Sequence, residues 1–157
     1  MKAHKVTIYT DGACKGNPGP SGWAYHISMT NDPNKYVIKS GSILEGTNNI
    51  AELTAVIEAL SSLKSTCIVD LYSDSMYVIN GCTNWLNTWR KNGYRNARNK
   101  PIENMELWKQ LDELLSKHSI KFNYVKGHSG NTLNDLVDQY ASNACDQVSI
   151  VNIRNIL

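Results

Sequence analysis

The strongest constraint on the fold is an amphipathic segment at residues 48–63, NNIAELTAVIEALSSL, which stands between strand-like runs. Its apolar residues recur at helical spacing and are Ile50, Leu53, Ile57 and Leu60. A strand-like run, TCIVDLY at residues 66–72, follows almost at once. Because a strand reached through a helix usually pairs in parallel with an earlier strand, we expect residues 66–72 to lie beside the first strand.

Three strand-like runs precede this helix, beginning near Val6, Trp23 and Tyr36. Turn signals separate them at residues 14–22 and 31–34, which predicts an antiparallel meander. Beyond residue 72 we expect a short helix capped by Ser73 or Asp74, a helix at 104–118, a strand at 120–125 and a last helix at 132–145. The inward face of that last helix is predicted to carry Leu133, Leu136, Val137, Tyr140 and Ala144. The fold class is therefore α/β (mixed α+β), with a five-stranded mixed sheet flanked by helices.

Length and composition exclude several classes of protein. The 157 residues suit one domain, and no apolar run approaches the roughly 20 residues of a membrane span. No charged-then-apolar leader resembles a signal peptide, so we expect a cytoplasmic protein with no membrane association. The four cysteines lack CxxC pairs and zinc-finger spacing, which predicts free thiols in a reducing compartment.

A basic segment at residues 90–100, RKNGYRNARNK, suggests a nucleic-acid partner. It carries no acid, and its cations are Arg90, Lys91, Arg95, Arg98 and Lys100. The aromatic residues that interleave with it or flank it are Trp85, Trp89, Tyr94 and Trp108. Cations with aromatics suit a phosphate backbone with stacked sugars or bases. The alternatives are a solvated charged face for the segment and core packing for at least one of Trp85 and Trp89.

Four acidic residues stand at the edges of predicted elements: Asp11, Glu52, Asp74 and Asp138. Each also has a local explanation. Asp11-Gly12 is a common turn pair, and Glu52 lies three residues after Asn49 at capping-box spacing. Asp74 could cap a helix or favour its first turn, and Asp138 could be an ordinary surface residue.

Together, the four acids indicate a metal site. Carboxylates at a few ångströms repel one another, so a fold gathers them only with a compensating cation. Oxygen ligands suit Mg²⁺ or Mn²⁺ rather than zinc. Two such ions can clamp the attacking water and the leaving oxygen of a phosphodiester. With the basic segment, this predicts a metal-dependent nuclease.

Four motifs identify a resemblance to a known family. They are TDGACKGNPGPSGW (10–23), TNNIAELTAVIEAL (47–60), SDSMYVINGCTNWL (73–86) and VKGHSGNTLNDLVD (125–138). In this order they closely resemble type 1 ribonuclease H, the small bacterial-style enzyme that cuts the RNA strand of RNA/DNA hybrids. The likeness runs from about residue 6 to 145, so we expect a catalytic domain at 1–146 and a tail at 147–157.

The resemblance implies hydrolysis of the RNA strand of RNA/DNA hybrids, leaving 5′-phosphate and 3′-hydroxyl ends. Asp11, Asp138, Glu52 and Asp74 would then bind two Mg²⁺ ions, for which Mn²⁺ can substitute. Asp11 would bridge the ions, Asp138 would serve the one that activates water, and Glu52 and Asp74 would help to hold the other. His128 matches the family's auxiliary histidine, which aids proton transfer or product release.

Substrate contacts are also implied by the resemblance. The positions that would touch the RNA minor groove are Cys14, Asn17, Asn48 and Asn49. Thr47 and Asn104 match a pocket for a DNA phosphate. The positions that match the DNA-strand channel and basic protrusion are Trp85, Trp108, Arg90, Lys91, Arg95, Arg98 and Lys100. One departure is Met76, where the family typically carries a hydrogen-bonding Gln.

The expected partner is therefore an RNA/DNA hybrid, and we expect a monomer. Two rival functions use the same elements. One is a different enzyme of this fold, such as an integrase, transposase or proofreading exonuclease. The other is a hybrid-binding module without catalysis, against which all four acids argue.

Overall fold

The structure is a computed structural model that describes residues 3–127 and 129–156, with side chains described through residue 147. Its elements, in chain order, are β1 (His4–Cys14), β2 (Gly19–Met29), β3 (Asp32–Gly46), α1 (Asn48–Ser61), β4 (Cys67–Ser73), α2 (Met76–Asn80), the π-helical turn η1 (Gly81–Trp85), α3 (Leu86–Asn92), α4 (Met105–Leu115), β5 (Ser119–Tyr124) and α5 (Thr132–Ile156). The predicted order of strands and helices is confirmed.

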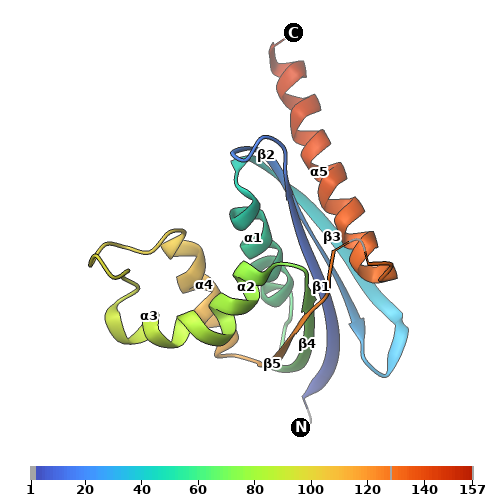
Figure 1. The fold of residues 1–157 in the computed structure, drawn as a ribbon. Coiled ribbons are helices and arrows are strands. Elements are labelled where there is room, and N and C mark those ends of the chain that lie inside the picture. The colour runs from blue at the N-terminus through green and yellow to red at the C-terminus, as the bar shows by residue number, and fades with distance from the viewer. Residues whose placement is uncertain (1–2, 128, 157) are drawn as a thin grey trace.

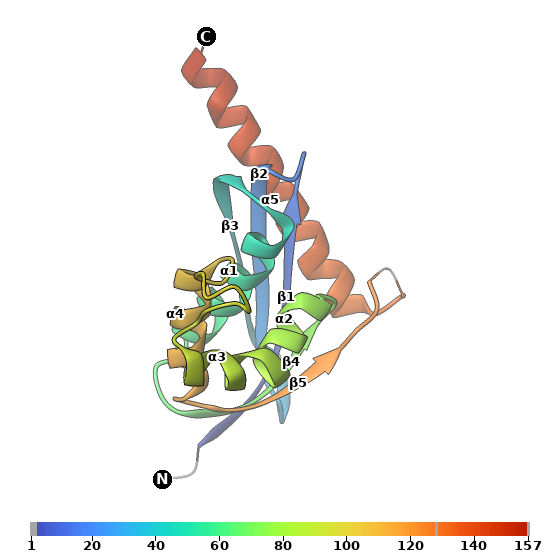
Figure 2. The ribbon, with the colours of Figure 1, turned by 60° about the vertical axis from the view of Figure 1, so that its left-hand side comes forward.

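The five strands form one mixed sheet in the order β3-β2-β1-β4-β5. β1 pairs antiparallel with β2, and β2 pairs antiparallel with β3. β4 lies parallel to both β1 and β5, so the predicted crossover through α1 is confirmed. Figure 1 shows α1 against one face of this sheet and α5 across the other, while α2, α3 and α4 project beyond α1. Figure 2 shows the same two-sided arrangement from a second direction.

The main core lies between the sheet and α1. It includes the buried residues Ile8, Val69, Leu71, Leu53, Val56 and Leu60. These residues alternate along the strands and recur at helical spacing along α1, so one apolar face of each element is covered. A smaller apolar cluster under α5 joins Ala24, Val137 and Ala141.

The predicted inward face of α5 is confirmed for Val137 and Ala144, which are buried, but not for Leu136 and Tyr140. Leu136 and Tyr140 are 36% and 37% exposed, whereas Ala141 and Ala144 are buried. The helix lies very close to β2, because a Cβ added at Gly22 would stand 2.1 Å from the carbonyl oxygen of Ala141. Small side chains fit the closest part of this interface, and Leu136 and Tyr140 lie outside it.

Several predicted boundaries are also corrected. β1 and β2 extend into the glycine-rich stretch, leaving only residues 15–18 as the turn. Ser75, rather than Ser73 or Asp74, caps α2, because its hydroxyl accepts from the Val78 backbone N–H. α5 continues to Ile156, past the expected helix end. Among the residues described, no helix combines the length and apolar character needed to cross a bilayer.

Candidate metal centre and nucleic-acid interface

Adjacent parallel strands deliver Asp11 and Asp74 to the same edge of the sheet. Tyr9 of β1 is the register partner of Tyr72 of β4, and their rings stack with centroids 4.7 Å apart. Asp11 follows two residues after Tyr9 within β1, so strand alternation directs its side chain to the same face of the sheet as Tyr9. Asp74 comes directly after the last residue of β4, Ser73.

Glu52 joins them because α1 approaches β1 unusually closely at Gly12. A Cβ added there would lie 2.5 Å from both the carbonyl carbon of Ala51 and the backbone nitrogen of Glu52. The Gly12 N–H donates to Glu52 Oε1 at 2.7 Å and to Asp11 Oδ1 at 2.9 Å. Only glycine allows this approach, since any side chain would overlap the helix backbone.

The capping-box explanation of Glu52 is wrong. The N-cap of α1 is Thr47, whose hydroxyl accepts from the Ile50 N–H at 3.1 Å. Glu52 lies further along the helix, and its carboxylate turns to β1 instead of to the helix terminus. One oxygen each of Asp11, Glu52 and Asp74 lies within 4.8 Å of the others.

The electrostatics of the centre favour protonation of Asp11 and Glu52 when no cation compensates their charge. Burial, followed by the charges of Glu52 and Asp74 and a hydrogen bond with Asp138, raises the pKa of Asp11 far above its usual range. Burial is also the main cause that raises the pKa of Glu52, with added repulsion from Asp74 and Asp138. Asp138 of α5 thus faces the same centre from the opposite side of the sheet.

The donor set fits a hard divalent cation. Asp11 Oδ2 and Glu52 Oε2 are buried and have no hydrogen-bond partner. Buried polar atoms are rarely left without a partner, because their desolvation is then uncompensated. A cation bound by these oxygens would supply that partner, and a cluster made only of carboxylates suits Mg²⁺ or Mn²⁺.

The loop between β5 and α5 lies against this centre. A Cβ at Gly127 would stand 3.0 Å from Asp74 Oδ2, so the backbone there passes beside the carboxylate. The predicted auxiliary residue His128 lies outside the described residues. Its role therefore stays a prediction.

The residues predicted to touch RNA gather around the β1–β2 turn and the start of α1. Asn17 Oδ1 accepts from the Asn48 N–H at 2.9 Å, which joins the turn to the helix N-terminus. Cys14 Sγ lies 3.4 Å from the Gly46 carbonyl oxygen. Asn49 follows in the first turn of α1. Met76, at the start of α2, is 47% exposed.

The two residues predicted to grip a DNA phosphate lie at helix starts. Thr47 caps α1, so its hydroxyl already accepts one internal hydrogen bond. Asn104 precedes α4 and donates through Nδ2 to the Tyr77 hydroxyl at 3.2 Å. The sequence reasoning missed Tyr77, which also accepts from Trp108 Nε1 at 2.9 Å. Tyr77 lies within the motif at residues 73–86, and this position was the sequence signal that could have identified it.

The predicted contact of Trp108 with a DNA strand needs correction. Trp108 is 0% exposed, so its ring offers no surface for a ligand. Gly81 allows this burial, because a Cβ there would stand 2.0 Å from the indole ring. Trp85, by contrast, is 38% exposed and packs at an angle against Trp89 and Tyr77. Trp108 is therefore the buried support of this aromatic cluster.

The basic segment forms the end of α3 and the loop that follows it. Lys91, Arg95, Arg98 and Lys100 are exposed, and none makes an ion pair within the described part of the chain. Arg90 differs, because it pairs with Asp112 of α4 at 2.6 Å. The basic segment contains no acid, but Asp112 of α4 pairs with Arg90, the first cation of the segment.

Comparisons with known proteins show relatives of this chain in sequence and in fold. The family model described as RNase H matches residues 3–146. A ribonuclease H of Legionella pneumophila (strain Corby) is 47% identical over 145 residues, covering 92% of this chain and 99% of that protein. The crystal structure of LC9-RNase H1, a type 1 RNase H with the type 2 active-site motif, has a TM-score of 0.81 at 26% identity, covering 94% of this chain and 74% of that one. LC11-RNase H1, solved in complex with an RNA/DNA hybrid, shares the fold with a TM-score of 0.69 at 24% identity, covering 91% and 98% of the two chains.

Proposed function

Because the chain belongs to the ribonuclease H family of hydrolases, we propose that it is an endonuclease that cleaves the RNA strand of RNA/DNA hybrids. The observation that carries this proposal is the cluster of Asp11, Glu52 and Asp74, in which one buried oxygen of Asp11 and one of Glu52 accept no hydrogen bond. A hybrid-binding module would have no need for such a costly cluster.

Two Mg²⁺ ions, or Mn²⁺ in their place, would be held by Asp11, Glu52, Asp74 and Asp138. When bound, these ions supply activation of the attacking water and stabilisation of the leaving 3′-oxygen, which yields 5′-phosphate and 3′-hydroxyl ends. The Gly12 N–H fixes the orientation of the Asp11 and Glu52 carboxylates before any ligand arrives. The proposed role of His128 is proton transfer or product release.

The two strands of the hybrid would contact different surfaces. The RNA strand would lie over the turn at residues 15–18 and the N-terminus of α1, where Cys14, Asn17, Asn48 and Asn49 stand. The exposed 2′-hydroxyls of RNA are the groups by which such polar side chains distinguish it from DNA. LC11-RNase H1, which shares this fold, was solved with an RNA/DNA hybrid, and this supports the choice of substrate.

The DNA strand would follow Thr47, Asn104, the exposed edge of Trp85 and the basic loop. Exposed cations there would neutralise phosphates, and the indole would stack on a sugar or base. Trp108 would act indirectly by supporting the cluster. We further propose that residues 1–146 form the catalytic domain, and that the protein acts as a monomer in the cytoplasm.

The test is cleavage of labelled RNA in an RNA/DNA hybrid, with duplex RNA and duplex DNA of the same sequence as controls. We expect Mg²⁺-dependent cleavage of the hybrid alone, with 5′-phosphate ends on the products. Equal cutting of duplex DNA would instead favour an integrase- or exonuclease-like activity. Binding without cleavage in any divalent cation would favour a non-catalytic module.

A further inference from the structure

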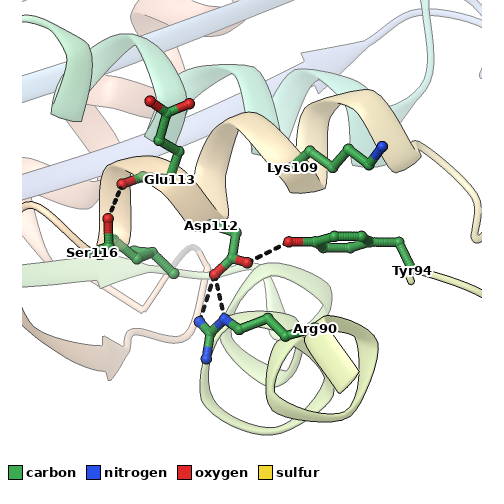
Figure 3. A pocket seen from close by; sticks show the side chains of 7 residues that line it. Arg90, Tyr94, Lys109, Asp112, Glu113 and Ser116 are labelled. Carbon is green, nitrogen blue, oxygen red and sulfur yellow. Dashed lines mark hydrogen bonds and ion pairs between the residues drawn. The ribbon is translucent and has the colours of Figure 1, made fainter. Parts of the chain in front are cut away.

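Asp112 of α4 lies at the base of the basic loop and contacts both sides of it. Its Oδ1 accepts a hydrogen bond from Arg90 Nε at 2.6 Å and forms an ion pair with Arg90 Nη2, also at 2.6 Å. Its Oδ2 accepts from the Tyr94 hydroxyl at 2.6 Å. Figure 3 shows this carboxylate between the two side chains, which come from α3 and from the start of the loop. One acid therefore holds two segments that are separated from it by about twenty residues of sequence.

On the acid's side these contacts are shielded from solvent. The Asp112 side chain is 11% exposed, whereas that of Arg90 is 47% exposed. Hydrogen bonds between an ionised donor and acceptor are the stronger kind, and partial burial reduces their screening by salt. Burial alone would raise the pKa of Asp112, but the hydrogen bonds from Arg90 and Tyr94 outweigh it and hold the pKa below its usual value.

The contacts of Tyr94 hold the two ends of the basic loop together. Its backbone N–H donates to the Trp89 carbonyl at 2.8 Å, and its own carbonyl accepts from Ile102 at 3.0 Å. The Lys109 ammonium stands 5.6 Å from the centre of its ring. The loop between these points carries three of the exposed cations, Arg95, Arg98 and Lys100. Its direction relative to α4 thus depends on the position of Tyr94.

We propose that Asp112 is a positioning residue for nucleic-acid binding: it clamps Arg90 and Tyr94 so that the basic loop presents its cations along the hybrid. This inference rests on the proposed function. Asp112 would then promote binding of the nucleic acid, although its negative charge alone would repel the phosphates.

Charge and position therefore predict opposite results for one substitution. Asp112→Asn removes an anion and releases Arg90, so the local net charge becomes more positive. If the surface acted only through its total charge, the hybrid would bind more tightly. If the clamp directs the loop, the hybrid binds more weakly despite the added positive charge.

The chain offers a matched control in the neighbouring residue. Glu113 also lies on α4 and has a side chain that is 74% exposed, with only a distant 3.8 Å pair to Lys117. Glu113→Gln changes the net charge by the same amount as Asp112→Asn and leaves the clamp intact. Tyr94→Phe is the complementary variant, because it removes one hydrogen bond of the clamp without changing any charge.

The experiment measures the dissociation constant of a labelled RNA/DNA hybrid in Ca²⁺ at low salt, together with cleavage kinetics in Mg²⁺. We expect Asp112→Asn and Tyr94→Phe to weaken binding by about three- to tenfold, the change expected when one or two phosphates are no longer neutralised. Glu113→Gln should bind as well as the parent or more tightly. Asp112→Asn should raise KM and retain kcat, since the clamp does not touch the carboxylate centre.

Circular dichroism at the assay temperature tests whether each variant is folded. If Asp112→Asn does not fold, the binding of Tyr94→Phe tests the inference by itself. Unchanged or tighter binding by both clamp variants would overturn the inference while leaving the proposed function intact. Failure of the parent protein to bind or cleave the hybrid would overturn the proposed function, and this inference with it.

Discussion

The backbone N–H of Gly12 donates to the carboxylate of Glu52 at 2.7 Å, although 40 residues separate them in sequence. The same N–H donates to Asp11, its neighbour. One backbone group of β1 thus orients two acids from different elements. This hydrogen bond depends on the close approach of α1 to β1, which links the packing of the core to the geometry of the metal centre.

Asp11→Asn should reduce hybrid cleavage to background and preserve hybrid binding in Ca²⁺, because the substitution removes a metal-binding charge and keeps the side-chain shape. It should also diminish the rise in Tm on adding Mg²⁺, which for the parent corresponds to about 2.7 kcal/mol when the ion is at 100 times its Kd. Asp32→Asn, at the start of β3 and away from the centre, is the control and should behave like the parent. Turnover by Asp11→Asn would refute the assigned metal role.

Gly12→Ala should lower both stability and activity, since its Cβ would overlap the backbone of Ala51 and Glu52. We expect the free energy of unfolding, measured in urea, to fall by about 1–3 kcal/mol or more, the usual cost of overpacking. Gly93→Asn is a suitable comparison. Gly93 has φ +74 and no atom within 4 Å of an added Cβ, and Asn tolerates this left-handed conformation. Equal stability of the two variants would contradict the close approach.

Trp85 and Trp108 should respond differently to substitution by alanine. Trp108→Ala should cost about 3–5 kcal/mol of stability, because the ring is fully buried in the core. Trp85→Ala should change stability less and weaken hybrid binding, since the half-exposed ring is available for stacking. Thermal unfolding and hybrid titration of both variants separate the two roles. Similar losses of stability would show that Trp85 is a packing residue as well.

The exposed cations should determine the salt dependence of binding. Replacement of Lys91, Arg95, Arg98 and Lys100 by Gln should weaken hybrid binding and flatten the plot of log K against log salt, by about 0.7–0.9 for each phosphate that is no longer neutralised. Arg90 is left in place because it pairs with Asp112. The same four substitutions should leave the free energy of unfolding almost unchanged. An unaltered salt slope would mean that the segment is only a solvated face.

Asp112 should contribute stability that depends on pH. Its folded-state pKa is held low, so the contribution is present above the unfolded pKa of about 3.9 and is lost as the pH falls toward the folded value. Asp112→Asn should therefore cost about 1.5–3 kcal/mol between pH 5 and 7, the range for hydrogen bonds to a charged group. This difference should shrink below about pH 4. A difference that persists unchanged in acid would assign the loss to packing.

Much of the fold follows from patterns that are local in sequence. The helical spacing of Ile50, Leu53, Ile57 and Leu60, followed at once by a strand, predicted the crossover and the parallel pair of β1 and β4. The face of α5 did not follow in the same way. Its apolar residues suggested Leu136 and Tyr140, whereas the close approach at Gly22 buries Ala141 and Ala144 instead.

Sequence patterns alone were enough to predict the element order, the residue types of the candidate centre and the presence of a basic segment among aromatics. Tertiary packing was needed to show that Asp11, Glu52 and Asp74 meet, that Trp108 is buried, and that Asp112 holds Arg90 and Tyr94. The reason is physical. Periodicity and turn chemistry act over a few neighbouring residues, whereas burial, ion pairing and close backbone approach arise only when distant segments pack together.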